Sequence, residues 1–143
     1  MDCVKGKLLE IDLSNGKSQV HKIDEEIQKK FYGGRYLGAK LLYDYQEAGV
    51  DPLSPENKMF VLTGPVTGTI VPNAGKYVVI TKSPLTGAYL DSYASGLISA
   101  QIRFAGYDGL LATGKAEKPV YIWIDDGKVE IRDAGHAWGK DTI

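Results

Sequence analysis

Cysteine and histidine are scarce in this chain. Among its 143 residues, Cys3 is the one cysteine, and His21 and His136 are the two histidines. A single thiol cannot form an internal disulfide, and alone it cannot hold a zinc ion or an iron–sulfur cluster. We therefore expect no metal site built from this chain alone, and we interpret Cys3 as a near-terminal thiol without a role.

The chain also lacks a dominant charge and long apolar runs. Its 17 Lys and Arg residues balance 18 Asp and Glu residues, which gives a formal net charge of -1, and 43% of its residues are hydrophobic. It has no basic excess to attract nucleic acid, no run of about 18 apolar residues, and no signal-peptide core near its start. We expect one globular domain with no nucleic-acid partner, no membrane segment and a cytoplasmic location.

What the chain does contain is a series of short β-forming runs separated by turn residues. Hairpin turns are indicated at 14–16 (Ser-Asn-Gly) and at 125–127 (Asp-Asp-Gly), because these residues accept positive φ. The expected strands span 7–13, 17–23, 59–63, 77–82, 88–91, 109–113, 120–125 and 128–132.

Three short helices are expected between these strands, at 25–32, 35–46 and 96–104. Asp24 precedes the first helix as an N-cap, and acidic residues follow it where the helix dipole favours them. Apolar side chains at helical spacing on the second helix are interpreted as core packing: Leu37, Leu41, Leu42 and Tyr45. The sequence therefore predicts an α+β fold of mainly antiparallel β-sheets with a few short helices.

No self-sufficient catalytic set is evident. His21 lies on a predicted hairpin and His136 near the C-terminal end, and neither belongs to a nucleophile motif. The acidic pairs at 25–26 and 125–126 are interpreted as a first helical turn and a hairpin turn. These patterns do not indicate catalysis by this chain alone.

The glycine-rich loop 64–76 is one candidate ligand site. It is not a Walker loop, because no Gly-Lys-Ser/Thr ends it. Lys76 could still place a cation and backbone amides at a phosphate, although a structural hairpin loop is the favoured alternative from local sequence. Valine at Gly64 or at Gly106 should damage folding if these glycines adopt positive φ.

The segment Tyr93-Ala94-Ser95-Gly96 is the other candidate. We expect it to end a short strand and to begin a helix, whose free N-terminal amides favour anions. From local sequence alone, the favoured alternative is that Ser92 or Ser95 is a plain N-cap.

The last four residues, 140–143, carry a helix-start signal. Asp141 or Thr142 would cap a helix, but no helix follows them. We hypothesise that the sequence is a piece of a longer polypeptide, and a natural stop codon directly after Ile143 would count against this.

Six collinear segments resemble the N-terminal domain of the tungsten-containing aldehyde:ferredoxin oxidoreductases. They are DPLSPENK (51–58), TGPVTGT (63–69), TKSPLTG (81–87), FAGYDG (104–109), GKAEKPVYI (114–122) and IRDAGHAWGK (131–140). The opening LEIDLSNG (9–16) also fits. The resemblance covers essentially the whole chain, and it implies that residues 1–143 are the pterin-cradling part of that domain.

The resemblance implies a two-sheet base with a few helices, on which a tungsten or molybdenum bis-pterin rests. It further implies a magnesium ion that bridges the pterin phosphates, and a [4Fe-4S] cluster bound by cysteines of later domains. Enzymes of this family oxidise aldehydes to carboxylic acids and pass the electrons to ferredoxin. The implied partners are the remaining domains of the same polypeptide, ferredoxin and the aldehyde, with a homo-oligomer left open.

Site residues follow from the same resemblance by position. Lys76 stands where the family typically shows an arginine near a pterin phosphate, and lysine keeps the charge without the bidentate fork. Tyr93 stands where an asparagine helps to bind magnesium, and its side chain has no amide carbonyl to offer. The implied cofactor-binding residues are Lys76, Ser92, Tyr93, Ser95 and Gly96. No catalytic or metal-ligating residue is assigned to this chain.

Three functions remain open at this point. The first is the cofactor-binding domain of a tungsten or molybdenum oxidoreductase, inactive as a fragment because the cluster ligands lie elsewhere. The second is a non-catalytic binding or assembly module related to that family. The third is a small independent sheet protein that binds an unrelated anion.

Overall fold

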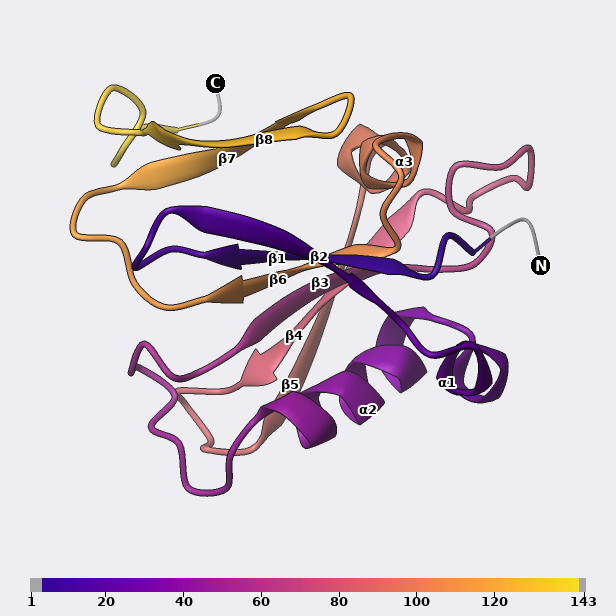
Figure 1. The fold of residues 1–143 in the computed structure, drawn as a ribbon, viewed down its shortest axis with the longest axis horizontal. Coiled ribbons are helices and arrows are strands. Elements are labelled where there is room, and N and C mark those ends of the chain that lie inside the picture. The colour runs from indigo at the N-terminus through magenta and orange to yellow at the C-terminus, as the bar shows by residue number, and fades with distance from the viewer. Residues whose placement is uncertain (1–3, 142–143) are drawn as a thin grey trace.

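The computed structural model describes residues 4–141 as two β-sheets and three helices (Figure 1). The strands are β1 (Lys7–Asp12), β2 (Lys17–Lys22), β3 (Met59–Thr63), β4 (Lys76–Lys82), β5 (Tyr89–Ser95), β6 (Gly109–Thr113), β7 (Val120–Asp125) and β8 (Lys128–Asp133). The helices are α1 (Glu25–Phe31), α2 (Gly34–Tyr45) and α3 (Leu97–Phe104). The sequence-based interpretations of Cys3 and Thr142 concern residues outside the described range.

The larger sheet has six strands in the order β2-β1-β6-β3-β4-β5, and β7 pairs with β8 in a separate hairpin. Every neighbouring pair is antiparallel except β1 and β6, which run parallel. The predicted α+β class with mainly antiparallel sheets is therefore confirmed. The parallel pair joins segments about a hundred residues apart, which no local pattern in the sequence indicates.

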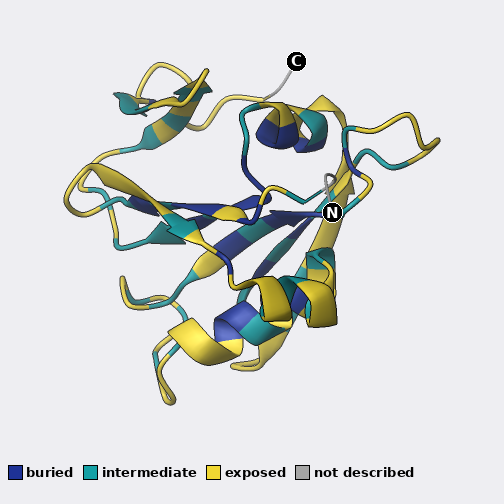
Figure 2. Ribbon diagram, turned by 45° about the vertical axis from the view of Figure 1, so that its right-hand side comes forward, coloured by how far each residue is buried: buried dark blue, intermediate teal, exposed yellow. Residues whose placement is uncertain are grey.

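Helices cover both faces of the large sheet (Figure 1). On one face, α1 and α2 pack over the buried residues Phe60, Leu62, Val78 and Ile80. On the other, α3 and the β7–β8 hairpin pack over a second cluster that includes Leu9 and Ile11. Figure 2 shows buried residues running along the central strands, between these two coverings.

Helix α2 confirms most of its predicted apolar face. Leu37, Leu41 and Leu42 are buried against the sheet. Tyr45 is 37% exposed, and its ring lies edge-on to Phe60 with the centroids 6.0 Å apart. Its inclusion in the buried stripe is therefore correct only in part, because the helix ends at Tyr45 and leaves that side chain at the rim of the core.

Strand β5 differs most from its prediction. The expected strand 88–91 extends to Ser95, and its partners on β4 run from Lys82 opposite Tyr89 to Lys76 opposite Ser95. The extension holds two serines, an alanine and a single β-prone residue, Tyr93, so its strand conformation depends on pairing with β4. The expectation that segment 93–96 ends a strand and begins a helix is confirmed, because β5 ends at Ser95 and α3 begins at Leu97. The N-cap role of Ser92 or Ser95 is wrong, because Gly96 is the N-cap of α3, without a side-chain cap.

The two glycines at which valine was predicted to damage folding differ in their backbone conformation. Gly106 has φ +93°. Gly64 does not have positive φ, and a Cβ there would find Thr67 Oγ1 at an ordinary 3.5 Å. The condition under which valine was predicted to damage folding is therefore met at Gly106 and not at Gly64.

The helices of the described chain are short. The longest, α2, has 12 residues, and none within residues 4–141 has the length and apolar character needed to cross a bilayer.

Candidate functional site

Two neighbouring hollows lie where loop 64–75 meets the start of α2. One has a volume of about 230 Å³ and is lined in part by Lys76. The other has a volume of about 350 Å³ and is lined in part by Arg35. Gly34, Gly64 and Tyr93 line both hollows, which are together called the glycine hollow here.

Backbone of the Gly33-Gly34 pair forms one wall of the glycine hollow. Gly33 has φ +144° and Gly34 has φ +55°, conformations that favour glycine. A Cβ on Gly33 would lie 3.2 Å from the carbonyl oxygen of Thr63 and 3.3 Å from the ring of Pro65. The two glycines therefore let the start of α2 pass close to the Gly64–Pro65 turn, and they leave main chain where a ligand can approach it.

The sheet register brings Lys76, Ser95 and Gly96 together. Lys76 lies directly opposite Ser95, and the amide of Gly96 donates to the carbonyl of Gly75 over 3.2 Å. The Lys76 side chain is exposed and forms no ion pair with any residue of the described chain. Lys76 is therefore available to an anion entering the glycine hollow.

Ser92 is separated from the other predicted site residues by the sheet itself. Residues opposite each other in an antiparallel pair share a face, and successive residues alternate between faces. Tyr93 lies opposite Val78, which is buried beneath α2, whereas Ser92 lies opposite Val79. Tyr93, Ser95 and Lys76 consequently share the α2 side of the sheet, and Ser92 points to the other side.

The loop leading to Lys76 is held closed by Thr67. The buried Thr67 hydroxyl lies 3.0 Å from the carbonyl oxygen of Ala74 and 3.2 Å from that of Lys76. The same oxygen accepts a hydrogen bond of 3.2 Å from the amide of Gly64. These bonds fix the shape of loop 64–75 in the absence of a ligand. A fixed shape is consistent with a purely structural loop and with a preformed binding loop.

Arg35 completes the site, although sequence reasoning did not select it. Its Nε donates to the hydroxyl of Tyr93 over 3.1 Å and lies 2.8 Å from the carboxylate of Asp91. Its guanidinium also stacks on the Tyr93 ring at 5.2 Å from the centroid. The hydrogen bond with Tyr93, and next the charge of Asp91, raise the pKa of Arg35 above its ordinary value. The Gly-Gly pair before Arg35 was the one local signal that could have drawn attention to it.

The donors around the glycine hollow suit an anion better than a metal ion. Two cations, Arg35 and Lys76, line the hollow together with Tyr93 and glycine backbone. Within residues 4–141 there is no cluster of three or more His, Cys, Asp or Glu side chains that could hold a metal. The Tyr93 hydroxyl accepts a hydrogen bond from the Arg35 guanidinium, and this positive charge beside it disfavours a magnesium ion there. The described side chains thus fit the phosphate end of a pterin cofactor, and they do not by themselves form a metal site.

The structure defines an α+β domain with a hollow lined by two cations and glycine backbone, and comparison with known proteins assigns this domain to a family. Residues 8–143 match the family model of the aldehyde ferredoxin oxidoreductase N-terminal domain. The chain belongs to this family of N-terminal domains.

Two curated relatives and one solved structure show the range of the similarity. The chain is 50% identical over 135 residues to the tungsten-containing aldehyde ferredoxin oxidoreductase of Pyrococcus furiosus, covering 94% of this chain and 22% of that protein. It is 42% identical over 148 residues to the WOR-like subunit of an aliphatic sulfonate oxidoreductase of the same organism, covering 100% of this chain and 23% of that protein. The active-site complex BamBC of benzoyl coenzyme A reductase, solved with 1,5-dienoyl-CoA, matches with a TM-score of 0.91 and 34% identity. The match covers 94% of this chain and 20% of that one.

The chain thus spans about a fifth of the length of these relatives. Their names describe reactions on an aldehyde, a sulfonate and a thioester-linked ring, although they share this fold. The specificity of each reaction therefore does not follow from the fold of this domain.

Proposed function

We propose that residues 1–143 are the cofactor-cradling base of a tungsten or molybdenum bis-pterin oxidoreductase that oxidises aldehydes to carboxylic acids with ferredoxin as acceptor. The observation that carries the proposal is the glycine hollow, with Lys76 and Arg35 beside it, in a domain 50% identical to that of a tungsten-containing enzyme. The bis-pterin, when bound, supplies the metal at which the substrate is oxidised. This chain's part is to bind and orient it.

Lys76 is proposed to neutralise a pterin phosphate, with the backbone at Ser95 and Gly96 next to it. An ammonium group acts on phosphate as a point charge, so the contact tolerates more movement than an arginine fork would. The [4Fe-4S] cluster is proposed to take its cysteine ligands from other domains of the same polypeptide, because Cys3 alone cannot hold it. A magnesium ion that bridges the pterin phosphates, a cytoplasmic location and a homo-oligomer are further predictions of the resemblance.

The proposal is tested on Lys76 in the full-length natural gene product. Lys76→Ala is expected to leave the fold nearly intact, because an exposed charge contributes little to stability, and to lower the pterin and tungsten retained per folded protein. Lys76→Arg should retain the cofactor, and Lys115→Ala, which removes an exposed charge elsewhere, is the matched control. Unchanged metal and pterin content in Lys76→Ala would refute the role of Lys76.

A non-catalytic assembly module is the second candidate. The exposed apolar side chains of α3 favour it, since Leu97, Ile98 and Phe104 are each more than half exposed. A full-length protein that folds well with neither pterin nor metal would support this alternative over the oxidoreductase.

A further inference from the structure

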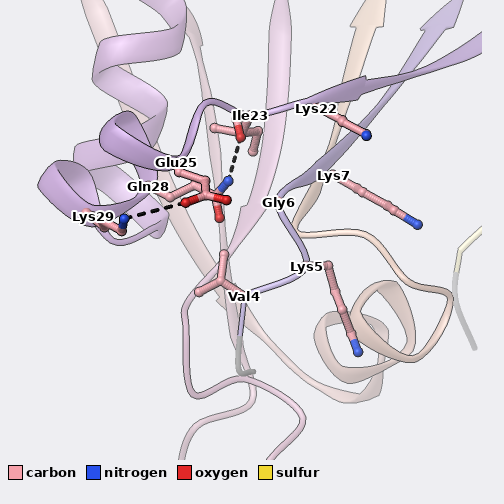
Figure 3. Close-up of a pocket in the computed structure, with 9 residues that line it drawn as sticks. All are labelled: Val4, Lys5, Gly6, Lys7, Lys22, Ile23, Glu25, Gln28 and Lys29. Atoms are coloured by element: carbon pink, nitrogen blue, oxygen red, sulfur yellow. Dashed lines mark hydrogen bonds and ion pairs between the residues drawn. The ribbon is translucent and has the colours of Figure 1, made fainter. Parts of the chain in front are cut away.

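A cationic hollow at the start of the chain lies apart from the residues that line the glycine hollow. It has a volume of about 330 Å³ and is lined by residues of β1, of the end of β2 and of α1 (Figure 3). Four lysines line it, and Lys29 among them is 3.5 Å from Glu25. The other three, Lys5, Lys7 and Lys22, form no ion pair with any residue in the range 4–141, and they are here called the lysine ledge.

The strand register makes this cluster unusual. Lys7 lies directly opposite Lys22 in the β1–β2 pair, and like charges in that position destabilise a sheet. At the other end of the same hairpin, Asp12 lies opposite Lys17. The β7–β8 hairpin likewise places opposite charges against each other at its end. The chain pairs opposite charges at comparable positions of its hairpins. The Lys7–Lys22 pair costs stability instead, which suggests that the two lysines serve binding and not the fold.

A buried carboxylate fixes the backbone that carries two of these lysines. The Asp108 carboxylate accepts hydrogen bonds from the amides of Lys5, Gly6 and Lys7, at 3.0, 2.5 and 3.2 Å. Asp108 also forms an ion pair with Arg103, and both residues are buried. The ledge therefore stands on a rigid base, which lowers the entropy lost when a partner binds.

The arrangement of the ledge favours a carboxylate-bearing surface over a small anion. In Figure 3 the ammonium groups of Lys5, Lys7 and Lys22 lie in a row on the side away from Glu25 and Gln28, and they do not converge on one point. A single phosphate would therefore reach only part of the row. No aromatic side chain lines the hollow, so bases of a single-stranded nucleic acid would find no ring to stack on.

We propose that the lysine ledge docks the acidic face of a protein partner, and that this partner is the electron acceptor of the oxidoreductase. Naming the acceptor rests on the proposed function, whereas the acidic character of the partner rests on the ledge. Rows of exposed charges raise association rates and select partners of opposite charge, which suits an encounter that must form and dissolve at each turnover.

The test measures ferredoxin binding to the full-length natural gene product by titration, without turnover. The triple variant Lys5→Glu, Lys7→Glu, Lys22→Glu is compared with Lys115→Glu, Lys118→Glu, Lys140→Glu, which changes the net charge equally at exposed lysines elsewhere. The ledge variant should lose affinity by about tenfold or more at low ionic strength, and the loss should shrink as salt is added. The control variant should bind close to wild type.

Lys7→Glu alone separates docking from a purely structural role. It places a glutamate opposite Lys22, so it should raise the midpoint of thermal unfolding while it weakens ferredoxin binding. A Lys7→Glu protein that is more stable and binds as well as wild type would overturn the proposal.

Three other results would also contradict it. The first is an equal loss of ferredoxin affinity in the ledge and control variants. The second is displacement of ferredoxin by a single pyrophosphate ion that binds and saturates the ledge. The third is tighter binding of duplex DNA than of ferredoxin. Aldehyde oxidation with a small uncharged dye is measured in parallel. A wild-type protein that binds ferredoxin through the ledge but oxidises no aldehyde would overturn the proposed function and leave the docking surface standing.

Discussion

Two arginine–aspartate pairs in this domain share their chemistry and differ in their surroundings. Arg103 and Asp108 are 7% and 4% exposed, and Asp108 also gathers three backbone amides from the start of the chain. The side chain of Arg35 is 53% exposed, and it holds Asp91 and Tyr93 at the rim of the glycine hollow. The first pair therefore fixes the fold, while the second orients a side chain beside a candidate binding site.

The largest expected effect comes from breaking the buried pair. Asp108→Asn removes the charge that compensates buried Arg103, and it should lower the free energy of unfolding by about 3–5 kcal/mol. Asp91→Asn is the matched control, because it removes the corresponding charge from the exposed pair, and it should leave the unfolding midpoint close to wild type. Chemical denaturation of both variants measures the difference, and equal losses would show that burial does not distinguish the two pairs.

A smaller effect is expected from one glycine in each region. Gly106, between Arg103 and Asp108 in the chain, has φ +93°, so Gly106→Ala should cost about 1–3 kcal/mol of stability. Gly64, on the glycine hollow, has neither positive φ nor a crowded Cβ position, so Gly64→Ala should be nearly neutral. Thermal unfolding of the two alanine variants checks this, and a larger loss in Gly64→Ala would contradict the backbone argument.

The smallest effect on stability is expected at Arg35. Arg35→Gln removes the ion pair with Asp91 and the stacking on Tyr93, but these contacts are exposed, so unfolding should change little. Pterin retention in the full-length protein should fall, because Tyr93 loses the partner that orients it. Stability that drops as far as in Asp108→Asn, with pterin content unchanged, would assign Arg35 to the fold and remove it from the site.

Local pattern predicted the elements of this fold well. The bounds of β3 and β6 were predicted without error, since each is an apolar run between turn residues. Residues 92–95 of β5 were missed because their strand conformation depends on pairing with β4, which the sequence of the segment does not show.

The candidate site was predicted less completely. The sequence and the resemblance selected Lys76, Ser95 and Gly96, which the register brings together, but also Ser92, which lies on the opposite face. Arg35 was missed because it meets Tyr93 across 58 residues of sequence. Contacts of that kind depend on the packing of α2 against the sheet, and no local pattern encodes them.

The most direct test of the account is the tungsten and pterin content of the folded, full-length wild-type protein. The account predicts that purified protein carries both groups together, and that extracting the pterin also releases the metal. A protein with cooperative unfolding that was produced with tungstate supplied, and yet contained neither group, would contradict the claim that this domain is the base of a metal–pterin site.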